Sequence, residues 1–117
     1  MYGLPGEPLF AMAHNPLAAV FRVKNYRQGR EKLLAACDEE VLGRQLSEGK
    51  LRLHVSPDFY DGFPATEEEF EAQMRSCTIA NLVGERVVDL AIKWGFVAKE
   101  NVIRIEGVPH AQWALFL

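Results

Sequence analysis

Residues 78–112 constrain the fold of this chain more than any other segment. They read TIANLVGERVVDLAIKWG, then FVAKE, then NVIRIEGVPHAQ. This order predicts a helix, a glycine stop at Gly95, a strand and a tight Gly-Val-Pro-His corner. The apolar side chains of the helix recur three and four residues apart and would form one buried stripe: Ile79, Val83, Val87, Leu90 and Trp94. We expect the helix and the corner to pack against each other.

The other segments alternate between strand and helix signals. Two strands, 19–27 and 32–37, are predicted to form a hairpin through Gly29. Asp38 would cap a short helix that ends at Gly49, and a third strand covers 51–55. Thr66 and Glu69 form a capping box that opens the next helix. The helix of residues 78–95 follows, and then strands at 101–106 and 111–117.

The predicted order is therefore ββαβααββ. It indicates an α+β fold, with a mostly antiparallel sheet and helices packed on one face. We expect residues 18–117 to form a single domain. Residues 1–17 show no periodicity and are rich in glycine and proline, so we expect a loose N-terminal arm.

Composition narrows the class of protein. With 49% hydrophobic and 25% charged residues, the chain has a globular composition. It contains no apolar run of about 18 residues and no basic segment ahead of an apolar one, so we expect neither a membrane partner nor a signal peptide. The two cysteines, Cys37 and Cys77, are too few for a disulfide scaffold. We expect both to be buried and the protein to be cytoplasmic.

Asn81, Gly84 and Glu85 would share one side of the predicted helix, because they lie three and four residues apart. A glycine inside a helix costs about 1 kcal/mol relative to alanine, and close packing of another backbone usually offsets that cost. In the structural interpretation, Gly84 admits the neighbouring strand or the 107–110 corner, and Asn81 holds the corner in place. In the functional interpretation, Asn81 and Glu85 bind a ligand.

The predicted corner at Gly107, Pro109 and His110 would hold the imidazole ring in one place. A fixed ring suits a general base or a ligand-binding histidine. The alternative is a turn whose histidine bonds a backbone carbonyl. If catalysis occurs here, His110 and Glu85 are the candidate catalytic residues, and Asn81 is a second group that could orient the ring.

A basic strand face is the other candidate surface. Arg22, Lys24 and Tyr26 would project from one side of the first strand, with Arg52 nearby. Cations beside an aromatic ring are typical of sheets that bind single-stranded RNA, although such a face is more often simply solvated. The net charge of −3 adds no general attraction for nucleic acid.

Motifs for metals and common cofactors do not occur in the sequence. It contains no CxxC or HExxH, and the three histidines are widely scattered. It also contains no GxSxG, P-loop or GxGxxG. We therefore expect no metal and no cofactor, and we disfavour a serine hydrolase, a nucleotidase and a dinucleotide-dependent enzyme.

Two late motifs, ANLVGERVVDLAIKWG and VIRIEGVPHAQ, resemble the signature of the archaeal domain-of-unknown-function 424 family. The earlier segment LAACDEEVLGRQLSEGKLRLHVSPDFYDG fits that family in the same order. The residues that match motif positions are Asn81, Gly84, Glu85, Gly107, Pro109, His110 and Gln112, with Cys37, Asp38 and Gly43 as lesser ones. The resemblance implies an archaeal cytosolic protein without an established activity, and a loose link to translation or RNA metabolism.

These observations favour a small non-enzymatic binding module that contacts RNA or a protein of the translation machinery. One alternative is a hydrolase or transferase for a small molecule, using His110 with Glu85 or Asn81. Another is a homodimer built on the apolar C-terminal strand QWALFL, because an exposed strand edge invites pairing.

Overall fold

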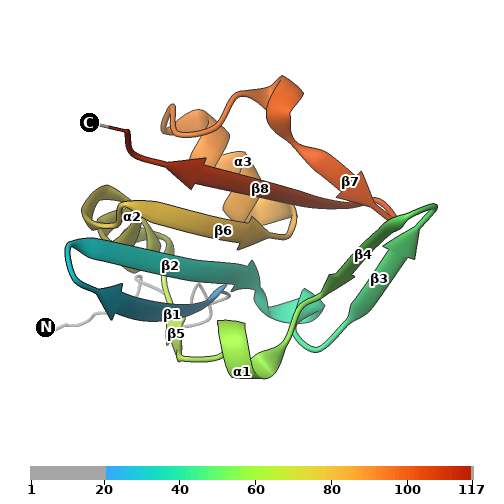
Figure 1. The fold of residues 1–117 in the computed structure, drawn as a ribbon, viewed down its shortest axis with the longest axis horizontal. Coiled ribbons are helices and arrows are strands. Elements are labelled where there is room, and N and C mark those ends of the chain that lie inside the picture. The colour runs from blue at the N-terminus through green and yellow to red at the C-terminus, as the bar shows by residue number, and fades with distance from the viewer. Residues whose placement is uncertain (1–20, 117) are drawn as a thin grey trace, which may run out of the picture.

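A computed structural model describes residues 21–116 and shows an α+β fold (Figure 1). Its main sheet has six strands in the order β5-β1-β2-β6-β8-β7, and β3 and β4 form a separate hairpin. The strands are β1 (Phe21–Gln28), β2 (Glu31–Asp38), β3 (Gln45–Glu48), β4 (Leu51–His54), β5 (Phe63–Ala65), β6 (Ile79–Val83), β7 (Ile103–Ile105) and β8 (Val108–Ala114). The helices are α1 (Pro57–Tyr60), α2 (Glu67–Ser76) and α3 (Glu85–Lys93), with single 3-10 turns at Glu39–Val41 and Lys99–Asn101.

The sheet is mostly antiparallel, as predicted. Only the central pair, β2 and β6, is parallel; the pairs β1–β2, β1–β5, β6–β8 and β7–β8 are antiparallel. The predicted β1–β2 hairpin is confirmed, and Gly29 lies in its turn at φ 59°. The predicted arm, residues 1–17, lies outside the described residues.

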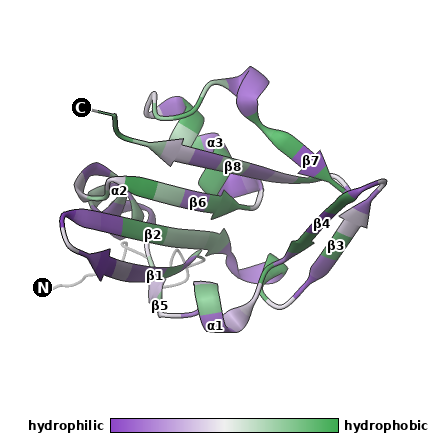
Figure 2. Ribbon diagram, in the orientation of Figure 1, coloured by the Kyte–Doolittle hydropathy of each residue, from purple (hydrophilic) through white to green (hydrophobic). Residues whose placement is uncertain are grey.

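Helices α2 and α3 cover one face of the sheet and lie behind it in Figure 1. The core between them and the sheet includes Leu34, Phe70, Met74, Leu82 and Val88, each at most 1% exposed. A second, smaller core lies on the opposite face, under α1 and the β3–β4 hairpin. In Figure 2 the right-hand part of β2 and most of β6 are hydrophobic, because these two central strands contribute to both cores. None of the described helices is long and apolar enough to cross a membrane.

The predicted helix at 78–95 is wrong in its first part. Residues Ile79–Val83 form strand β6, and α3 begins only at Glu85. Gly84 separates the two at φ 125° and ψ 155°, which a helix cannot contain. A short apolar run fits both periodicities, and here pairing with β2 on one side and β8 on the other supplies partners for the backbone.

The predicted helix from Asp38 to Gly49 is also wrong. Only Glu39–Val41 makes a turn of 3-10 helix, and Gly43 follows it at φ 87°. Residues Gln45–Glu48 instead form β3, in which Leu46 pairs with Leu53 and is buried against the second core.

The predicted Gly-Val-Pro-His corner is wrong because the turn lies earlier. Glu106 and Gly107 form it, at φ 51° and 80°, and β8 begins at Val108. Pro109 has no N–H to donate to the Gly84 carbonyl opposite it. It fits inside this strand because that carbonyl accepts from the Val88 N–H instead, in the first helical hydrogen bond of α3. The Gly84 N–H donates to the Pro109 carbonyl at 2.9 Å, so the prediction that these two motifs contact each other is confirmed.

Candidate functional site

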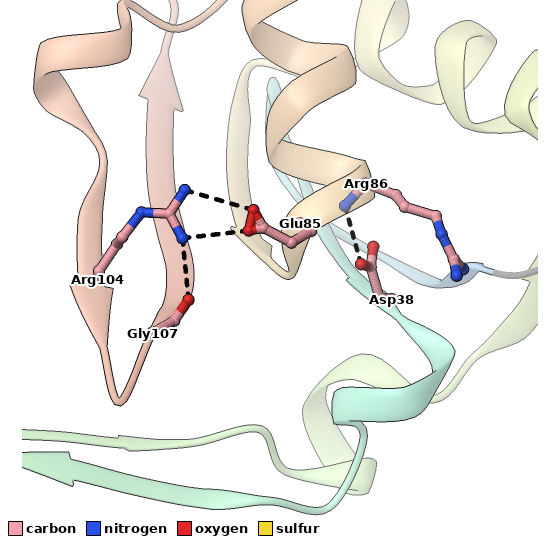
Figure 3. Close-up of polar contacts among 5 residues, drawn as sticks. All are labelled: Asp38, Glu85, Arg86, Arg104 and Gly107. Atoms are coloured by element: carbon pink, nitrogen blue, oxygen red, sulfur yellow. Dashed lines mark hydrogen bonds and ion pairs between the residues drawn. The ribbon is translucent and has the colours of Figure 1, made fainter.

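The start of α3 is held by the carboxylate of Asp38, a side chain that is only 1% exposed. One carboxylate oxygen accepts from the Arg86 N–H at 2.9 Å (Figure 3). The other accepts from the Val87 N–H at 3.0 Å. Burial raises the pKa of Asp38, and the two backbone hydrogen bonds oppose that shift. A Cβ on Gly84 would lie 2.5 Å from the Asp38 Cγ. The positive φ of Gly84 and its packing against Asp38 together explain why this position is glycine.

Glu85 projects from the first turn of α3 toward β7. Its carboxylate forms an ion pair with Arg104 at 3.1 Å, and the same guanidinium donates to the Gly107 carbonyl at 2.9 Å (Figure 3). The hydrogen bond to Glu85 raises the pKa of Arg104. Both side chains are more than half exposed, at 54% and 57%. This contact ties the β7–β8 turn to α3, on the helix side of the sheet.

Three other predicted residues lie on the opposite side of the sheet, which faces the viewer in Figure 1. Asn81 and Gln112 are directly paired across β6 and β8, and His110 lies two residues before Gln112 on the same face. Side chains paired in this way have Cβ atoms about 5 Å apart, and diagonal neighbours are about 7 to 8 Å apart. The register thus brings Asn81, His110 and Gln112 together.

The polar groups of this trio are partly satisfied. The Asn81 Oδ1 accepts a hydrogen bond from the hydroxyl of Tyr60 at 2.8 Å, which links β6 to α1. The His110 Nδ1 lies 3.0 Å from the Leu82 carbonyl oxygen. Because a carbonyl can only accept, this contact requires the hydrogen on Nδ1, which leaves Nε2 as the acceptor whenever the ring is neutral. No carboxylate hydrogen-bonds to the ring within residues 21–116, and Glu85 is paired with Arg104 instead.

An apolar row crosses the same face beside the trio. The register pairs Tyr26 with Leu33, Leu33 with Ile79, and Ile79 with Ala114. All four side chains are half-buried. Tyr26 and Leu33 also line a hollow of about 320 Å³. We call the four residues of this row, together with Asn81, His110 and Gln112, the front face.

Sequence reasoning did not identify the apolar row. Alternation in the second strand could have placed Leu33 on the outer face. Ile79 could not be placed, because its segment was predicted as a helix. In the described chain, no segment crosses in front of β6 and β8, while α1 and the β3–β4 hairpin lie beside them (Figure 1). The β6 and β8 part of the front face is therefore not covered by another segment of the described chain, whereas Tyr26 at its other end stacks on Phe59.

The predicted RNA-binding residues make internal contacts. Arg22 forms ion pairs with Glu39 at 3.6 Å and Asp61 at 3.4 Å. Lys24 donates to the Asp58 carbonyl at 2.8 Å.

Tyr26 stacks on Phe59, with ring centroids 5.3 Å apart, and donates its hydroxyl to the Phe59 carbonyl at 2.8 Å. Arg52 lies on β4, in the separate hairpin, and bonds to the carbonyls of Gly49 and Leu51. The three residues of β1 thus hold α1 in place, and RNA binding stays a prediction.

Both cysteines are buried, as predicted. Burial, with a smaller contribution from the neighbouring Asp38 carboxylate, raises the pKa of Cys37 to about 12. Burial raises the pKa of Cys77 to about 11. Both thiols are therefore protonated at neutral pH and are poor nucleophiles.

The family described as "Protein of unknown function (DUF424)" matches residues 26–116, which include the α3 cap and the whole front face. The chain belongs to the DUF424 family. Its fold is similar to that of an uncharacterized conserved protein from Methanopyrus kandleri, known from a crystal structure, with a TM-score of 0.65 and 25% sequence identity. That similarity covers 83% of this chain and 94% of the other. No curated protein matches the chain.

The family match confirms the resemblance seen in the two late motifs, and the structure confirms the predicted α+β fold. Neither comparison assigns an activity, because the family is described as of unknown function and the Methanopyrus kandleri protein as uncharacterized. Arg22 and Lys24 lie before the matched range, whereas Asn81, His110 and Gln112 lie within it.

Proposed function

We propose that this DUF424 protein is a non-enzymatic binding module that docks a partner protein on its front face. The observation that carries this proposal is the uncovered sheet above β6 and β8 (Figure 1). There an apolar row lies directly beside the hydrogen-bonding side chains of Asn81, His110 and Gln112. The partner segment that fits this surface has apolar side chains flanked by neutral hydrogen-bonding groups.

Charge supports a protein partner over RNA. The front-face residues of β6 and β8 carry no formal charge when His110 is neutral: Ile79, Asn81, His110, Gln112 and Ala114. Binding of nucleic acid depends mainly on cations placed against phosphates. The two cations on the same face of β1, Arg22 and Lys24, are engaged with acidic residues and with α1. The Tyr26 ring is already stacked on Phe59, so one of its faces is not available to a base.

The enzymatic alternative receives less support from the geometry. Glu85 and His110 lie on opposite sides of the sheet, so Glu85 cannot orient the imidazole. Asn81 is a diagonal neighbour of His110, but its Oδ1 is bonded to Tyr60. A general base needs a second group that positions it, and the ring is held by a backbone carbonyl instead.

Photo-crosslinking in extract of the source organism tests the proposal. A photoreactive residue placed at Gln112 should give a discrete adduct with a different protein, distinguished by its mass from two crosslinked 13.2 kDa copies of this chain, and ribonuclease treatment should not change it. The same residue at Lys93, an exposed position on α3 behind the sheet, is the matched control and should not give this adduct. Equal adducts at both positions, no adduct at Gln112, or an adduct lost on ribonuclease treatment would contradict the proposal.

A further inference from the structure

We propose that a second copy of this chain docks on the free edge of β8, so that the two sheets join about a two-fold axis at Ala114. The inference concerns the strand edge and is independent of what binds the front face. It rests on backbone groups that point away from the sheet, on the apolar residues beside them and on the register that those groups allow.

The hydrogen bonds of β8 fix which of its backbone groups point outward. Gly84 donates to the Pro109 carbonyl, and Leu115 donates to the Thr78 carbonyl at 2.8 Å. In an antiparallel pair the residues that bond to one neighbour alternate with those that face away from it. The backbone groups of Gln112 and Ala114 therefore point away from β6. Since β7 pairs with β8 only as far as His110, no strand within the described chain lies along this stretch.

The two edges of the sheet differ in how they resist pairing. At the far edge, β5 is only three residues long, Phe63–Ala65, and Pro64 lies at its centre. Short strands and proline are common ways of protecting an edge. On the other side the outermost strand, β7, is also short, and within the described chain it leaves residues 111–114 of β8 unpaired on this edge. This stretch contains no proline, and residues 111–117 read AQWALFL, without a charge. Leu115 is 47% exposed and Phe116 is 90% exposed.

The register follows from what already occupies the edge. His110 is paired with Ile103 of β7, so an incoming strand can extend only over the residues that follow. A two-fold axis at Ala114 places this residue opposite its own copy, and it places Gln112 opposite Phe116 of the second copy. The outward N–H and carbonyl groups of both chains then bond to each other. Such a contact uses the same patch on both copies, as closed dimers do.

This register has a consequence for the front face. Ala114 is the last member of the apolar row formed with Tyr26, Leu33 and Ile79. When it lies opposite its own copy, the two rows join into one continuous apolar stripe across both sheets. The dimer would therefore present one long docking surface in place of two short ones.

Sedimentation equilibrium tests the edge contact. The wild type should sediment as a dimer, at twice the 13.2 kDa of the chain. Phe116→Lys replaces an apolar side chain of the contact with a charged one, and Ala114→Pro removes an outward N–H without touching the bonds to β6. Each should weaken dimerisation by about tenfold or more. Phe63→Lys makes the same change at the protected edge, where Phe63 is 40% exposed, and should leave the dimer unchanged.

Disulfide trapping tests the register. Ala114→Cys places a thiol opposite its own copy, where paired Cα atoms lie about 5.5 Å apart, within disulfide range. Mild oxidation should give a covalent dimer, whereas Gln112→Cys should not, because Gln112 faces Phe116. A monomeric wild type, a dimer that survives both edge variants, or equal trapping at both positions would overturn the proposal. Circular dichroism confirms folding, and Phe116→Lys, at a 90% exposed site, keeps the test valid if Ala114→Pro unfolds.

Discussion

At the scale of single residues, Gly84 and Asp38 determine how β6 gives way to α3. We predict that Gly84→Ala destabilises the protein by about 3 kcal/mol or more, because strain at positive φ adds to overlap with Asp38. Gly29→Ala is the matched control: its φ is also positive, but its Cβ would meet nothing within 4 Å. That change should cost about 1 kcal/mol. Urea denaturation measures both, and equal losses would show that the Asp38 contact is not tight.

Because the two thiols are buried, the stability of the protein should vary with pH in the alkaline range. The pKa of Cys37 is raised to about 12 from the usual thiol value of 9.0, so the unfolded chain loses this proton first. The stabilisation is complete below pH 9 and is lost as pH rises toward 12. We predict that the free energy of unfolding falls between pH 9 and 11, and that Cys37→Ala reduces this slope. Parallel curves for the two proteins in urea titrations would refute the assignment.

At the scale of elements, the β3–β4 hairpin and the β7–β8 turn hold each other by two reciprocal bonds. The Glu106 carboxylate accepts from the Ser47 N–H at 2.7 Å, and the Glu48 carboxylate accepts from the Glu106 N–H at 2.7 Å. Glu106 is the only non-glycine residue with positive φ in the described chain, in a turn that usually prefers asparagine. The bonds to the hairpin explain how glutamate is tolerated there.

Replacing Glu106 should therefore distinguish its role in the β7–β8 turn from its hydrogen bond to the β3–β4 hairpin. We predict that Glu106→Asn keeps the turn, changes overall stability by about 1 kcal/mol or less, and exposes the Ser47 amide to hydrogen exchange. Glu106→Gln keeps an acceptor oxygen at the same reach, so protection of the Ser47 amide should persist. If the two variants exchange this amide equally fast, the carboxylate does not anchor the hairpin.

Elements with local signals could be predicted from the sequence. The capping box of α2 is confirmed, with Thr66 and Glu69 bonding each other's backbone at 2.8 and 3.1 Å. Strand β6 could not be predicted, because its apolar run also fits a helix and its partner β2 is distant in sequence. Asn81, His110 and Gln112 were each identified as candidates, but their common face depends on the β6–β8 register. Local patterns do not contain that register.

At the scale of the whole molecule, the two faces of the sheet are covered to different extents. Helices α2 and α3 bury one face, while α1 and the β3–β4 hairpin cover only part of the other (Figure 1). The net charge is −3, yet the charged residues leave the β6 and β8 part of the front face neutral. A partner bound there should lose little affinity when salt is raised, whereas an RNA complex would lose affinity steeply.

The most direct test of front-face docking is the affinity of the crosslinked partner, once purified, for two leucine variants. Leu33→Glu places a charge in the apolar row, away from the β8 edge, and Leu51→Glu makes the same change on the hairpin, at a site 43% exposed. We predict that Leu33→Glu weakens binding measured by calorimetry by about tenfold or more, while Leu51→Glu binds like wild type. With both variants folded by circular dichroism, unchanged affinity for Leu33→Glu would contradict the proposal that the front face is the binding surface.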